Sequence, residues 1–213
     1  MHQQKIISSP SFSLCFTRAE DATKKGSIAG ALTMGGTDTK LHLSTMIYAV
    51  GFPTKGVMHG VHIRKVYIME SGQYETKDVT DKNTHIVDIS EGMLNSGSVI
   101  VDSGTTDTYM TRNLRQPFQK AFQKVVGFEY NSGGMKLTEE QVYKLPTIII
   151  QLKGHEEANE ALMEDKDEEK RGSGYVIGLA GRIDKKFPTD ILIAIPPAHY
   201  IEFDTDHDKY VGR

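Results

Sequence analysis

The clearest periodic pattern of the chain begins at Arg115, where apolar side chains recur at spacings of three and four residues. This spacing places them along one face of a helix, while Gln119, Lys120 and Lys124 lie on the opposite face. The sequence therefore predicts an amphipathic helix that packs across a sheet. The apolar positions are Phe118, Ala121, Phe122, Val125 and Val126.

A second, shorter helix is predicted after Thr138. Thr138 and Gln141 have the spacing of a capping box, in which each side chain accepts a hydrogen bond from the other residue's backbone N–H. Pro146 ends the helical stretch, because proline has no backbone N–H to continue the hydrogen-bond ladder. Both helices are explained as structural elements.

Most of the remaining pattern favours β-strands separated by turns. Strands are predicted at residues 12–16, 42–50 and 56–69. Hairpin turns are predicted at two glycine-containing pairs, Gly35-Gly36 and Ser71-Gly72. The 20 glycines and the frequent Thr, Val and Ile residues agree with a fold that is mainly β, with a few short helices.

His59 and His62 have the H-x-x-H spacing that can indicate a metal site. In an alternating strand, however, positions three residues apart lie on opposite faces. We therefore interpret them as exposed or half-buried strand histidines and predict no metal site and no cofactor.

Length and composition fit one globular domain that spans residues 1–213. The chain is 38% hydrophobic and 25% charged, so it can bury a core. Its net charge of −3 and its isoelectric point of about 6.2 give no electrostatic reason to expect a nucleic-acid partner. No stretch reaches the roughly 18 to 20 apolar residues of a membrane span.

Residues 155–172 differ in composition from the rest of the chain. Between His155 and Arg171 there are eight acidic and three basic residues, so this segment alone contributes −5 while the rest sums to +2. An acidic docking loop is one interpretation. A solvated, mobile insertion between two strands is the interpretation that we favour, because charge runs are usually solvated.

The candidate chemistry lies at Val101 to Thr106, a hexapeptide that occurs once in the chain. Residues 98–101 contain three successive apolar, β-branched side chains, Val99, Ile100 and Val101, and predict a buried strand that ends at Asp102. Gly104 allows backbone geometry that a side chain forbids, and the hydroxyls of Ser103 and Thr105 can orient a carboxylate. An ordinary surface turn is the alternative, since Asp, Ser and Gly are common turn residues.

The stretch VIVDSGTTDTYM resembles the second active-site loop of the pepsin-like aspartic proteases, with β-secretase-like members as the most similar. Four other segments resemble parts of that family in the same order. They are FSLCF (12–16), GALTMGGTD (30–38), KLPTIII (144–150) and ILIAIPPAHY (191–200). The resemblance spans roughly residues 6 to 203, and its specific parts are the hexapeptide and the GGTD segment.

The resemblance implies the fold of the C-terminal lobe of a two-lobed acid protease. The first lobe, with its own Asp-Thr-Gly loop and flap tyrosine, has no counterpart in this sequence. The family's last active-site strands have no counterpart either. We therefore expect a truncated lobe that is cut at both ends, whose acidic insertion falls at about 155–172.

The resemblance also implies the function of an aspartic endopeptidase that hydrolyses peptide bonds in a peptide or protein substrate. Asp102 is the implied catalytic residue, paired with an aspartate of the missing N-terminal lobe to activate a water. Ser103, Gly104 and Thr105 are implied to hold its geometry. Thr106 and Tyr109 are implied to line the substrate cleft.

Two alternatives remain open at this stage. One is a catalytically silent binding or inhibitory protein on the same fold, although the intact Asp-Ser-Gly-Thr sequence argues against it. The other is a homodimeric protease in which two copies of the Asp102 loop meet.

The resemblance also implies a location for the protein in the secretory or endolysosomal (vacuolar) pathway. The single cysteine, Cys15, leaves no disulfide within the chain and is interpreted as a small core residue.

Overall fold

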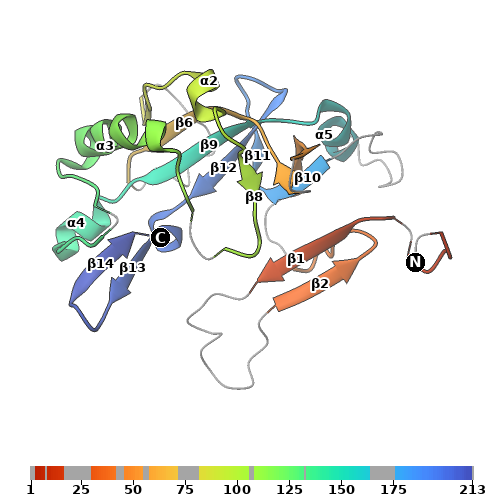
Figure 1. Ribbon diagram of the computed structural model, residues 1–213, viewed down its shortest axis with the longest axis horizontal. Helices are drawn as coiled ribbons and strands as arrows, with labels where there is room; N and C mark the ends of the chain where they lie inside the picture. The colour runs from red at the N-terminus through yellow and green to blue at the C-terminus, as the bar shows by residue number, and fades with distance from the viewer. Residues whose placement is uncertain are drawn as a thin grey trace.

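The computed structural model describes residues 3–7, 9–16, 30–41, 46–54, 58–71, 82–105, 108–131, 133–163 and 176–212. Within these ranges the protein is mainly β, with short helices (Figure 1). The helices are α2 (Glu91–Leu94), α3 (Arg112–Val126), α4 (Glu139–Tyr143) and α5 (Glu156–Met163), with a 3-10 turn η2 (Pro197–His199).

A five-stranded antiparallel sheet with the strand order β11-β12-β9-β6-β7 is the largest element of the fold. Its strands are β6 (Ile63–Met69), β7 (Thr84–Ile86), β9 (Thr147–Lys153), β11 (Arg182–Ile183) and β12 (Asp190–Ile195). The central strand β9 reads TIIIQLK, and this near-continuous apolar run suits a strand with neighbours on both sides.

Four smaller sheets surround it, and the described strands in each are antiparallel. The first pairs β1 (Phe12–Phe16) with β2 (Gly30–Met34), the second β3 (Met46–Val50) with β10 (Val176–Ala180), and the third β13 (Ile201–Asp204) with β14 (Lys209–Gly212). The fourth has the order β4-β5-β8 and comprises β4 (Phe52–Pro53), β5 (His59–Gly60) and β8 (Ile100–Val101).

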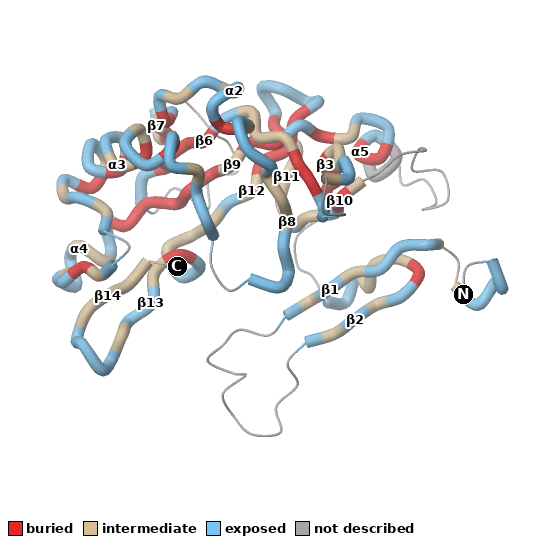
Figure 2. Tube along the Cα trace, in the orientation of Figure 1, coloured by how far each residue is buried: buried red, intermediate tan, exposed pale blue. Residues whose placement is uncertain are grey.

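The main core lies between one face of the large sheet and helices α2 and α3, which cover it in Figure 1. Phe118 and Phe122 of α3 pack against Val66 and Ile68 of β6, and the Phe122 side chain is fully buried. The buried residues follow the central strands and the inner side of α3 (Figure 2). The predicted amphipathic helix is therefore confirmed, and it begins three residues earlier than the pattern indicated.

The other local predictions have mixed outcomes. The capping box is confirmed, because Gln141 N–H donates to Thr138 Oγ1 at 3.3 Å and Thr138 N–H donates to Gln141 Oε1 at 2.9 Å. The strands predicted at residues 12–16, 42–50 and 56–69 correspond to β1, to β3, and to β5 with β6. Residues 42–45 and 55–57 of those predictions, and Gly72 of the second predicted turn, lie outside the described residues.

Gly35-Gly36 is not a hairpin turn, and that prediction is wrong. The pair follows β2, but β2 pairs with β1 and the next strand, β3, pairs with β10. Gly35 has a φ of 88° and its N–H donates to Ser11 O at 2.8 Å, so the pair closes the end of the β1–β2 ladder. Turn composition cannot identify a partner strand that lies 130 residues further along the chain.

Cys15 lies half-buried on β1 and its thiol donates to Leu41 O at 3.5 Å. The β1–β2 hairpin is largely exposed, so the interpretation of this cysteine as a core residue is wrong. The alternating apolar pattern of β1 is real, but it does not face the core: Phe12, Leu14 and Phe16 are all exposed.

Candidate active site

The candidate catalytic aspartate, Asp102, directly follows β8 in the chain. Figure 1 shows the position of β8 in the fold. In the register of this small sheet, Val101 lies opposite His59 and Ile100 opposite Gly60. Val61 N–H adds a hydrogen bond to Val99 O at 3.0 Å. Ile100 and Val101 are half-buried rather than buried, so the prediction of a buried strand at residues 98–101 is only partly right.

Asp102 lies directly after β8, on a turn. The backbone N–H of Gly104 donates to Asp102 Oδ1 at 2.8 Å, which fixes the carboxylate against its own turn. A Cβ atom at position 104 would lie 3.2 Å from that same oxygen. Gly104 is thus favoured by the close approach of the carboxylate, and not by a left-handed backbone conformation.

The predicted site residues share one exposed stretch. Asp102, Ser103, Gly104 and Thr105 are all exposed, and 79% of Tyr109 is accessible to solvent. Thr106, predicted to line the substrate cleft, lies outside the described residues. The structure therefore brings the predicted catalytic and supporting residues together at the surface, with the Asp102 oxygen held by a backbone amide.

The segment that leads into β8 is anchored to β6 by contacts that the sequence analysis missed. Asn95, just after α2, accepts a hydrogen bond from Ile63 N–H at 2.9 Å and donates one to Ile63 O at 2.7 Å. One turn earlier, Glu91 Oε1 accepts from His62 Nε2 at 2.6 Å and from Arg64 Nη1 at 3.0 Å. The hydrogen bond from His62, with a further contribution from Arg64, holds the pKa of the Glu91 carboxyl below its usual value.

One local signal for this anchor is present in the sequence. Ser90 stands before the short run Glu91-Gly-Met-Leu, and its side chain caps α2 by accepting from Met93 N–H at 3.3 Å. Serine is a favoured N-cap residue, so a helix start here could have been predicted. His59 and His62 fall in different segments, because His59 lies on β5 while His62 precedes β6 and bonds Glu91.

A buried polar cluster lies at the edge of β9 and β12. Gln151 Nε2 donates to Asp184 Oδ2 at 2.9 Å and to Asp190 Oδ2 at 3.1 Å, while its oxygen accepts from the Tyr67 hydroxyl at 3.2 Å. Burial raises the pKa of the Asp190 carboxyl, and the nearby Arg64 guanidinium partly opposes that shift. These carboxylates are on a different part of the fold from Asp102, and their hydrogen bonds with Gln151 stabilise the large sheet.

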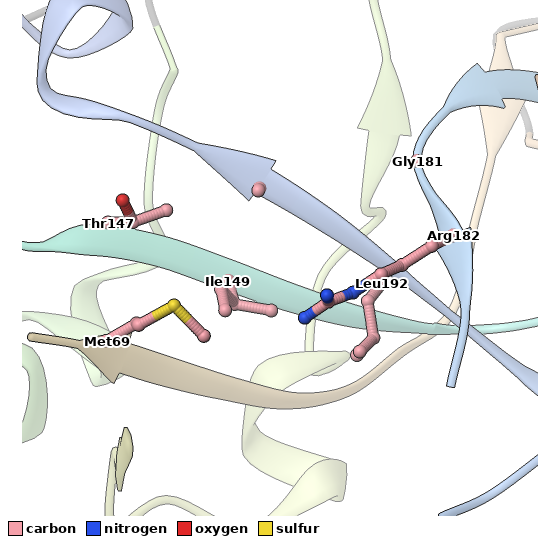
Figure 3. A pocket seen from close by; sticks show the side chains of 7 residues that line it. Met69, Thr147, Ile149, Gly181, Arg182 and Leu192 are labelled. Carbon is pink, nitrogen blue, oxygen red and sulfur yellow. The ribbon is translucent and has the colours of Figure 1, made fainter. Parts of the chain in front are cut away.

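A cavity of about 170 Å³ lies on the large sheet, as Figure 3 shows. It is lined mainly by apolar side chains. The lining residues are Met69, Thr147, Ile149, Gly181, Arg182, Leu192 and Ala194. None of them belongs to the Asp102 turn, so this cavity does not form part of the predicted peptidase site.

The described residues contain no group of three or more His, Cys, Asp or Glu side chains that could hold a metal ion. No helix within those ranges combines the length and apolar character needed to cross a bilayer. The acidic segment is only partly described: its first half forms α5, and residues 164–175 lie outside the description.

The interpretation of residues 155–172 as a solvated insertion is wrong for its first half. Ala158 is fully buried in α5, and Asn159 is 4% exposed. Asn159 accepts from Tyr48 N–H at 2.8 Å and donates to Tyr48 O at 2.9 Å, which anchors α5 to β3. The segment does lie between two strands, β9 and β10, as expected.

No protein-family model matches the chain, and no curated protein matches it.

Proposed function

We propose that this chain provides one of the two catalytic aspartates of a pepsin-like aspartic endopeptidase. The observation that carries the proposal is the placement of Asp102: it is exposed, it follows the half-buried strand β8, and its Oδ1 accepts the Gly104 N–H at 2.8 Å. The resemblance of residues 99–110 to the family's second active-site loop supplies the chemical interpretation of that placement.

The proposed chemistry needs a second carboxylate. Two neighbouring carboxyls do not ionise together easily, so one stays protonated while the other removes a proton from the attacking water. Asp102 then acts as one member of the pair, and an aspartate of a second lobe acts as the other. The Gly104 N–H donates to Asp102 Oδ1 and so fixes the orientation of this carboxylate.

In this proposal Ser103, Gly104 and Thr105 hold the geometry of the loop, and Thr106 and Tyr109 line the cleft for an extended peptide substrate. The high exposure of Tyr109 leaves its ring accessible to such a peptide. Extended peptides bind clefts through backbone hydrogen bonds and side-chain pockets, which requires the partner lobe to complete each pocket.

The test begins with the reading frame that surrounds Met1. We expect the extended product to encode an Asp-Thr-Gly or Asp-Ser-Gly loop, and the purified extended protein to cleave peptides at acidic pH with sensitivity to pepstatin. Asp102→Asn is expected to lower kcat by about 10²-fold or more, because general acid-base catalysis contributes on that order. An upstream stop codon with no such loop would contradict the proposal.

Asp38→Asn is the matched control. Asp38 Oδ1 also accepts a backbone N–H two residues on, from Lys40 at 3.0 Å, and it also lies outside any helix or strand. We expect this variant to keep its activity, since Asp38 lies on a separate turn after β2 and is not one of the proposed catalytic or cleft-lining residues. Pepstatin-sensitive activity of the 213-residue chain alone, lost in Asp102→Asn, would favour the homodimeric protease instead.

A further inference from the structure

Arg64 lies between two carboxylates that differ in burial. Its Nη1 donates to Glu91 Oε1 at 3.0 Å, and its Nε lies 3.5 Å from Asp190 Oδ1. The Glu91 side chain is 43% exposed, whereas that of Asp190 is 9% exposed. One guanidinium therefore contacts both an exposed carboxylate on α2 and a buried carboxylate on β12.

The contact on the buried side is incomplete. Arg64 Nε and Asp190 Oδ1 are both buried, and neither atom has a hydrogen-bond partner in the described part of the chain. Buried polar atoms without partners are uncommon and costly, so such a pair needs an explanation. The other Asp190 oxygen is satisfied by Gln151, which binds Asp184 with its same nitrogen.

We propose that Arg64 forms a pH-dependent ion pair, which we call the latch. Near neutral pH its guanidinium is shared between the carboxylates of Glu91 and Asp190, and when Asp190 takes up a proton it pairs with Glu91 alone. A neutral Asp190 no longer attracts the guanidinium, and the Glu91 ion pair then has no competitor. Because α2 leads through Asn95 into β8, acidification strengthens the attachment of residues 91–102 to β6.

The charged groups around Asp190 favour this order of protonation. In the described part of the chain these are Arg64 on β6, Asp184 before β12 and Glu91 on α2, together with Lys153, which is opposite Asp190 in the β9–β12 register. Burial and the two acidic neighbours raise the pKa of Asp190, while the contacts of Glu91 lower its own pKa. The proposal requires Asp190 to be neutralised before Glu91 as the pH falls, and the opposite directions of the two pKa shifts favour that order.

His62 is a second partner of Glu91, with its Nε2 2.6 Å from Glu91 Oε1. The latch is tightest below the raised pKa of Asp190 and above the lowered pKa of Glu91. The latch does not depend on the peptidase proposal. Only its functional role, which is to keep the Asp102 segment attached to β6 at acidic pH, rests on that proposal.

The experiment measures hydrogen exchange in the 213-residue chain from about pH 7 to about pH 4.5, with each rate divided by the intrinsic rate of an unfolded peptide. The reporters are the amides of Leu94 and Asn95, which donate to Ser90 O and Glu91 O. We expect their protection to rise about 5-fold on acidification, a size typical of a partly exposed ion pair.

Three variants separate the contributions. Asp190→Asn imitates the neutral acid and is expected to show the higher protection already at about pH 7. Glu91→Gln is expected to abolish the rise. Glu140→Gln is the matched control, because Glu140 is also an ion-paired carboxylate with a lowered pKa, but it pairs with Lys144 on the distant α4.

An equal rise in Glu91→Gln, or an Asp190→Asn protein with the pH dependence of wild type, would overturn the latch. So would a rise that disappears in His62→Gln, since His62 would then be the sole sensor. If Asp190→Asn does not fold, carbon NMR of wild-type carboxyls decides: Asp190 titrating at or below its ordinary pKa contradicts the proposal. Asp102→Asn should leave the exchange of the Leu94 and Asn95 amides unchanged. A failure of the peptidase proposal can therefore be distinguished from a failure of the latch.

Discussion

The side-chain amide of Asn95 pairs with both backbone groups of Ile63, with hydrogen bonds of 2.9 and 2.7 Å. Ile63 lies at the register shift of β6 against β9, where the regular ladder is interrupted. At this point the side-chain amide of Asn95 supplies the donor and the acceptor that the backbone of a neighbouring strand would otherwise supply. It also fixes the start of the short connection that ends at Asp102.

Asn95→Ala is expected to lower the free energy of unfolding by about 1–3 kcal/mol, because it leaves two half-buried backbone groups without these partners. Denaturant titration of the wild type and the variant measures the difference. Asn113→Ala is the control: Asn113 donates one exposed hydrogen bond to Ser96 Oγ, and its loss should cost about 0.5 kcal/mol or less. Equal effects for the two variants would show that Asn95 is not a special anchor.

The sequence predicted the local elements of this region better than their connections. The periodicity of residues 115–126 and the Thr138 capping box depend on neighbours within four residues, and both are confirmed. The contacts that hold the Asp102 segment are nonlocal: Asn95 bonds a residue 32 positions away, and Glu91 bonds one 27 positions away. Nothing in the local pattern around Asn95 distinguishes it from an ordinary turn asparagine.

A second asparagine does the same for α5. Asn159→Ala is expected to cost about 2–4 kcal/mol, since Asn159 is buried and bonds both backbone groups of Tyr48. Glu160→Ala, at the exposed neighbouring position of the same helix, should change stability by about 0.5 kcal/mol or less. Chemical denaturation of both variants makes the comparison, and a small effect of Asn159→Ala would contradict the anchoring role.

This anchor explains why charge composition misled the interpretation of residues 155–172. The acidic side chains of α5 are on its outer side, with Glu156, Glu157 and Glu160 exposed, and they dominate the composition. Two residues, Ala158 and Asn159, supply the buried side. The partner of Asn159 is 111 residues earlier in the chain, so its role depends on the tertiary fold.

Tyr200 should control part of the alkaline stability. Its ring is buried, its hydroxyl donates to Pro146 O at 2.6 Å, and burial raises the pKa of this phenol far above the usual tyrosine range. The folded state therefore keeps a proton that the unfolded chain releases near pH 10, and stability falls as the pH rises beyond that value.

Tyr200→Phe removes this linkage. Above about pH 10 the wild type should lose up to about 1.4 kcal/mol per pH unit more than the variant, which corresponds to one proton. Urea unfolding at several alkaline pH values measures both slopes. At neutral pH the variant should be about 1–2 kcal/mol less stable, because Pro146 O loses its donor. Identical alkaline slopes would show that Tyr200 ionises in the folded protein.

Gly181, between β10 and β11, is expected to tolerate no side chain, although it is only half-buried. A Cβ atom there would lie 2.5 Å from Leu192 O and 2.7 Å from the Ile47 Cδ1 atom, and the carbonyl cannot move without disturbing β12. Gly181→Ala should therefore cost about 1–3 kcal/mol. Gly92→Ala is the matched control, because a Cβ at this α2 position meets nothing within 4 Å.

The control is expected to be neutral or stabilising by up to about 1 kcal/mol, since alanine is a better helix former than glycine. Thermal and denaturant unfolding of the two variants give the comparison directly. The two glycines look equivalent in the sequence, so an opposite sign for the two substitutions tests the close approach of Gly181 to β12 and β3. A Gly181→Ala protein as stable as Gly92→Ala would mean that Gly181 lies further from Leu192 and Ile47 than the structure shows.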